Sequence, residues 1–286
     1  MLLNLLRFLP RNQLSWLVGQ LAHLRLPPPL GGWSVRQFVR FFRIDPATAS
    51  QPISSYRSIG EFFTRELAPG LRPLGLEPVS PVDGAVRAAG AITGGMLEQV
   101  KGRRYPLAML LGDEALAARY AAGVVFNLYL SPPDYHHVHS PVSGSIRAAR
   151  WIPGTLWPVN DWSVNRIENL FGRNERIVIE IESPRFGLVT CVMVGATNVG
   201  RMSVTFDDIV TNSSPGRFRP GQRERRYTPA PAVTAGDRLG TFHLGSTVIL
   251  LFEAGRLEGG AVQPGERIQM GHSLVAPGGA EHAKNL

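Results

Sequence analysis

The first pattern along the chain is a helical repeat of apolar residues between positions 12 and 26. Apolar side chains that recur at intervals of three and four share one face of an α-helix. The residues with this spacing are Leu14, Leu17, Val18, Leu21 and Leu24. Three prolines at 27–29 follow, and proline cannot continue a helix interior. We therefore predict an amphipathic helix over 12–26.

A second helix is predicted over 34–43, and it carries both charge and aromatic bulk. Its arginines recur at i, i+4 and i+7, while phenylalanines supply apolar surface. These residues are Arg36, Arg40, Arg43, Phe38, Phe41 and Phe42. A basic amphipathic helix is typical of contact with an anionic membrane surface. The pattern also fits a helix packed on the core or on a second subunit.

From about residue 77, short apolar runs separated by glycine and proline replace the helical pattern. Such runs predict β-strands, here at 124–130, 176–181, 188–194 and 248–252. The chain contains 31 glycines and 23 prolines, which fits many turns between short strands.

An internal repeat lies within this β-rich part. The segments "SPVDGAVRAA" at 80–89 and "SPVSGSIRAA" at 140–149 share seven of ten residues. A proline, a glycine turn and an alternating strand that recur together predict two related β-units that pack against each other. Asp83 stands where the second copy has Ser143, so the turn does not require a carboxylate. Asp83 therefore serves either chemistry or an Asx-type turn contact.

These elements predict an α+β fold that is mainly β. Its antiparallel β-rich core is built from the two related PV-x-G units, and N-terminal amphipathic helices precede it. We expect a helical, membrane-associating region over 1–58 and a catalytic β-rich domain over 59–286. A length of 286 residues allows one substantial core with a smaller appended element.

Arginine carries almost all of the positive charge. The formal net charge is +8, and Lys101 and Lys284 are the only lysines. Such a balance favours an anionic partner, which is a membrane surface, a nucleic acid or an acidic metabolite. Five of the arginines lie in 211–230, which is predicted as a loop.

The single cysteine, Cys191, excludes an intrachain disulfide and a cysteine-based metal cluster. It lies in a run predicted as a buried strand, which is compatible with a reducing compartment. The sequence contains no run of 18 or more apolar residues, so we predict no membrane-spanning helix. The apolar start "MLLNLLRFLP" lacks the basic leader of a signal peptide, and Pro10 ends it early. We expect a cytoplasmic protein.

Three of the seven histidines lie within "PDYHHVH" at 133–139, directly after a predicted strand. Such a cluster fits acid–base chemistry, a metal site or a structural role. A metal site needs further close ligands, and the sequence near His136 and His139 offers no second cluster of them.

The segment "HLGSTVIL" at 243–250 places a serine directly after a glycine and before a predicted strand. It differs from the G-x-S-x-G elbow of common hydrolases, which precedes a helix. A serine, a histidine-rich segment and an aspartate that its turn does not need indicate a triad of Asp83, His139 and Ser246.

Several of these segments resemble the bacterial phosphatidylserine decarboxylase family, whose members are pyruvoyl-dependent proenzymes. The resemblance runs from residue 59 to about residue 255. It covers "IGEFFTRELAPGLRPL", "SPVDGAV", "KGRRYPLAMLLG", "DYHHVHSPVSG", "NLFGRNER", "VGATNVG" and "AGDRLGTFHLGSTVIL". The segment from Leu244 to Thr247 matches the self-cleavage tetrapeptide of the family.

The resemblance implies that the chain cuts itself between Gly245 and Ser246. The products are a β chain of 1–245 and an α chain of 246–286, which remain associated. Ser246 then becomes a covalent pyruvoyl group, the one cofactor expected, and no metal is expected. Gly245 lacks a Cβ, which leaves its carbonyl open to attack. Thr247 fits either a contact with the oxyanion or a strand cap.

The family also suggests roles for the other site residues. His139 matches the base of the cleavage reaction, and Asp83 matches the carboxylate that orients it. His136 matches a histidine implicated in decarboxylation. His137 stands where the family has arginine, so the contacts of the anionic head group stay open. The arginines within 217–226 are candidates for them.

The implied reaction is the decarboxylation of phosphatidylserine to phosphatidylethanolamine in phospholipid biosynthesis. The pyruvoyl ketone condenses with the amine of the substrate and accepts the electron pair released as carbon dioxide leaves. The expected protein is peripheral, on the anionic cytoplasmic face of the cell membrane. It is expected to be a homodimer and not to bind nucleic acid.

Other readings of the sequence are weaker but distinct. A pyridoxal-phosphate decarboxylase requires a lysine, and Lys101 and Lys284 are the only choices. A serine hydrolase would use Asp83, His139 and Ser246 without cutting its own chain. A biotinyl-type or lipoyl-type carrier module requires a hairpin lysine that neither PV-x-G unit has. A nucleic-acid-binding module would interleave aromatic residues with the arginines of the loop.

Overall fold

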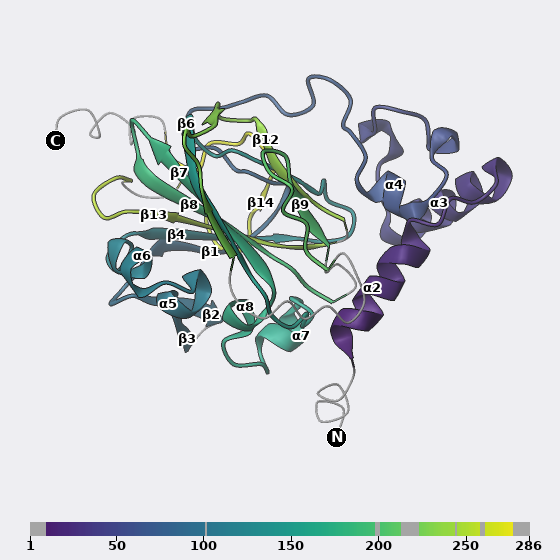
Figure 1. The fold of residues 1–286 in the computed structure, drawn as a ribbon. Helices are drawn as coiled ribbons and strands as arrows, with labels where there is room; N and C mark the ends of the chain where they lie inside the picture. Colours follow the sequence, from purple (N-terminus) through teal and green to yellow (C-terminus); the bar gives the residue numbers. More distant parts are fainter. Residues whose placement is uncertain are drawn as a thin grey trace.

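The computed structural model of the protein describes residues 10–100, 102–197, 201–212, 223–243, 245–257 and 261–276. Its centre is a nine-stranded antiparallel sheet in the order β10-β6-β7-β8-β13-β4-β1-β14, with β11 also paired to β6 (Figure 1). The strands are β1 (Gly84–Ala91), β4 (Val124–Leu130), β6 (Gly144–Ile152), β7 (Arg176–Ser183), β8 (Gly187–Val194), β10 (Arg223–Arg226), β11 (Ala232–Val233), β13 (Ser246–Phe252) and β14 (Arg267–Ile268).

Both faces of this sheet are buried. A small sheet in the order β5-β12-β9 lies over one face, and short helices lie against the other (Figure 1). The covering strands are β5 (His137–His139), β9 (Met202–Val204) and β12 (Arg238–Phe242). The covering helices are α5 (Leu107–Leu111), α6 (Glu114–Arg119), α7 (Asp161–Val164) and α8 (Leu170–Arg173), and the hairpin of β2 (Met96–Val100) and β3 (Arg103–Pro106) lies beside them.

Strand β13 contributes to both cores, because successive side chains of a strand point to opposite faces. Val248 and Leu250 lie in the core between the two sheets. Ile249 and Leu251 lie in the core beneath the helices. Every residue of β13 is buried, which explains why its sequence is a continuous apolar run rather than an alternating one.

The expectation of a mainly β, antiparallel fold is confirmed, and so are its four predicted strands. The segment 124–130 forms β4, 176–181 lies within β7, 188–194 lies within β8 and 248–252 lies within β13. Cys191 is fully buried in β8. Strand β13 begins two residues earlier than predicted, at Ser246.

The two PV-x-G units pack against each other and exchange equivalent hydrogen bonds. The amide of Val79 donates to the Pro141 carbonyl at 2.9 Å, and the amide of His139 donates to the Pro81 carbonyl at 2.9 Å. Each donor is the residue directly before one repeat, and each acceptor is the proline at the second position of the other repeat. This reciprocal pairing brings His139 next to the turn that carries Asp83.

The resemblance between the two units extends into their strands. The register of β1 against β4 shifts between Val86 and Ala88, and that of β6 against β7 shifts between Ile146 and Ala148. These positions match in the aligned repeats. The structure therefore confirms two related β-units that pack together.

The N-terminal helices differ from the prediction at their ends. Helix α2 spans Arg11–Ala22, and helix α3 spans Pro28–Phe42. The first ends before residue 26, and the second begins six residues before the predicted position 34. The reason is that proline fits the first turn of a helix, where its missing N–H has no partner to lose. The proline run therefore lies between α2 and α3 and also forms the first turn of α3.

The apolar face of these helices lies in solvent. Leu17 and Leu21 of α2 are 48% and 62% exposed, and Phe41 of α3 is 81% exposed. The opposite side of α3 packs through Val35 and Val39 on Phe62 of helix α4 (Ile59–Phe63). None of the helices among the described residues combines the length and apolarity needed to cross a membrane.

The prediction of a loop over 211–230 is wrong in part. Residues 223–226 form β10, which pairs with β6 at the edge of the large sheet. Ion pairs of Arg225 with Asp207 and Asp208 accompany this pairing. The charged residues of this strand gave no apolar pattern from which a strand could be predicted, because an edge strand buries little side-chain surface. Residues 213–222 lie outside the described residues.

The matched glycines of the two units give a test of this packing. A methyl group on Gly144 would lie 2.2 Å from the Glu182 carbonyl oxygen, and one on Gly84 would lie 2.4 Å from the Tyr129 carbonyl oxygen. Gly144→Ala and Gly84→Ala should each lower the free energy of unfolding by about 1–3 kcal/mol, since backbone must move. Urea denaturation measures the change.

The control for this prediction is Gly19→Ala in α2, where a methyl group meets no atom within 4 Å. It should raise the free energy of unfolding by about 0.5–1 kcal/mol, because alanine favours the helix. Equal effects of the three substitutions would contradict the close approach of the strands.

Candidate active site

The Gly245–Ser246 bond lies where β13 enters the large sheet. Ser246 is opposite Leu130 of β4, and Thr247 is opposite Val194 of β8. The Ser246 side chain is fully buried, and its Oγ has no hydrogen-bond partner in the described part of the chain. The same is true of the buried Thr247 Oγ1, again counting the described residues alone. Leu244 lies outside the described residues.

His136 lies beside this bond and offers it a free lone pair. Its Nδ1 is 2.7 Å from the Asp134 carbonyl oxygen, which only accepts, so Nδ1 carries the proton. Nε2 therefore carries the lone pair, and no described residue forms a hydrogen bond with it. A methyl group on Gly245 would lie 3.5 Å from this Nε2. The ring is thus held as a neutral base against the Gly245 backbone.

The surroundings of His136 keep it neutral. The side chain is fully buried, and this burial lowers its pKa to about 3, with the positive charge of Arg65 acting in the same direction. The ring of Phe63, from α4, packs on the imidazole with the ring centroids 3.9 Å apart. Helix α4 therefore contributes a wall of the site.

His139 is oriented in the same way but is engaged at both nitrogens. Its Nδ1 donates to the Gly236 carbonyl at 2.7 Å, so Nε2 accepts from the Tyr135 hydroxyl at 3.2 Å. Burial lowers the pKa of His139, so this ring is neutral too. The Tyr135 ring also stacks on the imidazole, with centroids 5.6 Å apart.

Asp83 is held by a cation and by the backbone. Arg72 contacts both carboxylate oxygens, with Nε–Oδ1 at 2.8 Å and Nη2–Oδ2 at 2.5 Å. The amide of Met270 donates to Oδ1 at 2.8 Å. A fork of this kind fixes the orientation of the carboxylate. In the second unit Ser143 instead contacts Glu77, with Oγ–Oε1 at 2.6 Å.

The predicted residues therefore gather in one region without forming a continuous triad. The reciprocal pairing of the two units brings His139 to the turn of Asp83. Within the described residues, neither Asp83 nor Ser246 is hydrogen bonded to His139, whose partners are Tyr135 and Gly236. His136 is the histidine next to Gly245.

His137 ties the histidine segment to the chain that follows α4. Its Nε2 is 3.1 Å from the Thr64 carbonyl oxygen, so it donates there, and its Nδ1 accepts from the Thr241 hydroxyl at 2.8 Å. Burial lowers the pKa of His137 to about 4. His137, where the resemblance leads us to expect an arginine, is thus a neutral link between the histidine segment and the chain after α4.

The residues that hold these groups were not assigned roles from the sequence. Phe63 and Arg72 both lie in "IGEFFTRELAPGLRPL", and Tyr135 lies in "PDYHHVH". Phe63 contacts His136 from a distant part of the chain, while Arg72 lies 11 residues from Asp83 and Tyr135 four residues from His139. None of these contacts follows a helix or strand period that the sequence could reveal. The same holds for the contact of His23, which follows α2, with His243; their ring centroids are 5.8 Å apart.

The arginines proposed as head-group contacts divide into two groups. Arg217 and Arg219 lie outside the described residues. Arg223, Arg225 and Arg226 lie on β10, where acidic residues pair with Arg225 and Arg226. No group of three or more His, Cys, Asp or Glu side chains in the described part of the chain is arranged to hold a metal ion.

Comparison with known proteins places these features in a family. The model of the family described as "Phosphatidylserine decarboxylase" matches residues 59–276. A phosphatidylserine decarboxylase proenzyme of Anaeromyxobacter sp. (strain K) is 46% identical over 279 residues, which cover 95% of this chain and 96% of the relative. The proenzymes of Brevibacillus brevis and Myxococcus xanthus are 37% and 39% identical, over 95% and 89% of this chain and 96% and 90% of those relatives.

The buried neutral histidines predict how stability depends on pH. Burial lowers the pKa of His136 to about 3 and of His137 and His243 to about 4, while the unfolded chain titrates near 6.5. Below 6.5 the unfolded state binds more protons, so the free energy of unfolding falls as pH falls. Burial raises the pKa of Glu175 to about 8 and also raises that of Glu180, which opposes this trend, while the lowered pKa of His139 adds to it.

We therefore expect the free energy of unfolding from urea titrations to decrease between about pH 6.5 and pH 4.5. His243→Gln should make that decrease shallower, because it removes one of the buried neutral imidazoles. A flat profile, or an unchanged slope in the variant, would contradict the burial of these rings in the neutral state.

Proposed function

The chain belongs to the phosphatidylserine decarboxylase family, and from this we propose that it decarboxylates phosphatidylserine after cutting itself between Gly245 and Ser246. The product is phosphatidylethanolamine, made as part of phospholipid biosynthesis. The observation that carries the proposal is the Ser246 hydroxyl, which is fully buried without a partner directly after a glycine that faces the His136 lone pair. A buried hydroxyl that forms no hydrogen bond lowers the stability of the fold, so its presence at residue 246 favours a chemical role.

The cleavage is a displacement at the Gly245 carbonyl. The Ser246 Oγ attacks that carbon and passes its proton to a histidine, and the C–N bond breaks as the amine of Ser246 takes a proton. Loss of the Ser246 Cα proton then breaks the Cβ–Oγ bond and releases Gly245 as a carboxylate. Water replaces the nitrogen at Cα, so one ammonia leaves and a ketone remains at residue 246.

The assignment of the base to His139, with Asp83 behind it, makes a structural demand. The His139 Nε2 carries a lone pair, but the Tyr135 hydroxyl occupies it at 3.2 Å. His139 must therefore exchange Tyr135 for Ser246 before it takes the proton. His136 needs no such exchange. Substitution of each histidine therefore distinguishes which of the two is the base.

The pyruvoyl group, once formed, would supply a ketone that binds the substrate amine and withdraws electrons as carbon dioxide leaves. Residues of this chain fit a group at that position. His136 Nε2 lies 3.5 Å from the position that a methyl group on Gly245 would take. Because Nε2 carries a lone pair, it would have to take up a proton before it could pass one to a carbon next to residue 246. Phe63 and the burial of His136 exclude water from this side.

The two chains produced by cleavage should remain together. The α chain would begin with β13, which is hydrogen bonded to β4 on one edge and to β8 on the other. Both neighbours belong to the β chain. Because all seven residues of β13 are buried, release of the α chain would open both cores.

The membrane surface is the proposed location of the reaction. The exposed leucines of α2 and the exposed Trp33 and Phe41 of α3 form an apolar surface beside the arginines of α3. Such a surface suits a peripheral protein on an anionic bilayer, here the cytoplasmic face of the cell membrane. The homodimer is proposed from the resemblance alone.

Cleavage is tested by intact mass spectrometry of the denatured protein. The unaltered chain should give two fragments, 1–245 and 246–286, with a blocked amino terminus on the smaller one. Ser246→Ala, His139→Gln and Asp83→Asn should remain in one piece, and His136→Gln should be cut but lack decarboxylase activity. Losses of about a hundredfold or more in rate are expected for acid–base residues.

Two controls sharpen this test. Tyr135→Phe removes the competitor for the His139 lone pair, so it should not slow the cleavage. Ser54→Ala, at an exposed position of the helical region, should leave both reactions unchanged. If His136→Gln stays intact while His139→Gln is cut, the base is His136 and the assignment to His139 is wrong.

The membrane contact is tested by sedimentation with vesicles of phosphatidylcholine and phosphatidylglycerol. Trp33 and Phe41 are 56% and 81% exposed, so Trp33→Ser with Phe41→Ser should weaken binding at least tenfold without lowering stability. The control is Met109→Ser, 40% exposed on α5 away from the N-terminal helices. Unchanged binding of the double variant would exclude α3 as the contact.

A further inference from the structure

A polar cavity of about 420 Å³ lies between the helical region and the site. On one side it is lined by the end of α3 and the turn after it, through Arg43, Asp45 and Thr48. On the other side it is lined by the turn that precedes the catalytic histidines, through Asp134 and Tyr135. The other polar residues of its lining are Arg65, Arg72, Asp83, Arg267, Gln269 and His272, so that with Arg43 the cavity has four arginines.

The carboxylates of this cavity are already satisfied by the protein. Asp83 is held by Arg72, and Asp134 accepts from Arg267 and from Ser131. Asp45 caps the short helix after α3 by accepting from the Ala47 amide at 2.9 Å. The two ion pairs neutralise Arg72 and Arg267, which leaves Arg43 and Arg65 as the uncompensated cations next to the capping carboxylate.

Arg65 is the unusual member of the lining. It is only 3% exposed, and its guanidinium donates from Nη2 to the Pro133 carbonyl at 3.0 Å. Its Nε and Nη1 are buried and have no hydrogen-bond partner among the residues that the structure describes. The guanidinium lies 4.8 Å from the centre of the Phe62 ring, and burial lowers its pKa. A buried guanidinium with unmet donors is costly, and an anion in the cavity would satisfy it.

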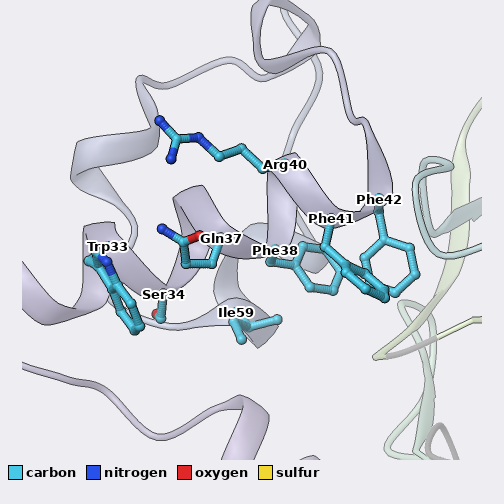
Figure 2. A pocket seen from close by; sticks show the side chains of 8 residues that line it. All are labelled: Trp33, Ser34, Gln37, Phe38, Arg40, Phe41, Phe42 and Ile59. Atoms are coloured by element: carbon cyan, nitrogen blue, oxygen red, sulfur yellow. The ribbon is translucent and has the colours of Figure 1, made fainter.

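An apolar groove adjoins this cavity along α3. The groove has a volume of about 630 Å³ and is lined by aromatic side chains, as Figure 2 shows. Trp33, Phe38, Phe41, Phe42 and Ile59 are its apolar members. Arg40 points away from these rings (Figure 2). Because Arg43 follows Phe42 directly, the apolar groove and the cationic cavity meet at the end of α3.

We propose that the cavity is a phosphate-binding site for the head group of a phospholipid at the bilayer surface, with Arg65 and Arg43 as its donors. The neighbouring apolar groove and a phosphate site are matched to the two halves of such a lipid. The site rests on the membrane contact proposed above, but it does not require that the bound lipid be the one that reacts. Arginine suits the role because its planar donors match two phosphate oxygens.

The test measures binding of uncleaved Ser246→Ala protein to vesicles of phosphatidylcholine with phosphatidylglycerol, which is not the substrate. In that background, Arg65→Gln should weaken binding about tenfold, as loss of a charge-assisted contact does. Arg43→Gln should weaken it more than Arg36→Gln, which removes the same charge from α3 outside the cavity. Arg104→Gln, exposed on β3, is the matched control and should bind unchanged.

A second measurement separates lipid from free phosphate. Inorganic phosphate should raise the melting temperature more than chloride at equal ionic strength, and Arg65→Gln should abolish the difference. If phosphate acts but vesicle binding is the same in Arg65→Gln and Arg43→Gln as in the parent, the ligand is a free anion and the lipid proposal is wrong.

The phosphate site can still be tested if one of the variants does not fold. Should Arg65→Gln unfold, Arg43→Gln decides, because Arg43 is exposed and its replacement leaves the core intact. Equal vesicle binding of Arg43→Gln and Arg36→Gln would then overturn the proposal. Decarboxylation is not read in any arm, so failure of the catalytic proposal would leave these results unchanged.

Discussion

The pairing of β13 on both of its edges is the constraint on which the rest of the site depends. Seven residues of β13 form ladder pairs with β4, and six of them also pair with β8. A strand held in this way cannot slide or rotate, so its first residue has a fixed position. That residue is Ser246, and the bond before it lies at the boundary between the rigid sheet and the turn that leads into it.

The histidine segment is fixed by a different device, which sets the chemistry of each ring. His136 and His139 both donate from Nδ1 to a backbone carbonyl, at 2.7 Å in each case. This places the lone pair of each ring on Nε2 and, together with burial, keeps both rings neutral. The difference lies in the partner of Nε2, which is Tyr135 for His139 and absent for His136. The two histidines are therefore both neutral, but the Nε2 lone pair is occupied in His139 and unoccupied among the described residues in His136.

The end of α4 and the two residues after it also take part in this arrangement. Phe63 covers His136, the Thr64 carbonyl holds His137, and Arg65 donates to Pro133 in the turn before both. Three successive residues therefore clamp the histidine segment from outside the large sheet. The same stretch of chain connects to α3 through Phe62, so the exposed apolar surface and the buried histidines share one rigid support.

Patterns within a short stretch of sequence predicted the local elements well. The apolar run 248–252 and the repeat "SPV-x-G" gave the central strand and the two related units, because burial and turns are encoded by adjacent residues. The fork of Arg72 on Asp83 and the contact of Phe63 with His136 could not be predicted in this way. They join segments that only the folded chain brings together.

The edge strand β10 shows a second limit of the sequence. Its four residues are all charged and all exposed, so no hydrophobic pattern marks it, and only its pairing with β6 makes it a strand. The start of α3 shows a third, because a proline run both ends and begins helices. The division into a helical region over 1–58 and a catalytic domain over 59–286 stays a prediction.

The central claim is that this chain cuts the bond before its central strand and keeps both pieces in one fold. Mass spectrometry of one purified sample under native and under denaturing conditions tests it most directly. We predict a single non-covalent assembly of the two pieces in the native spectrum, and separate masses for 1–245 and 246–286 in the denatured one. A single full-length chain in both spectra, from a sample that decarboxylates phosphatidylserine, would contradict the account.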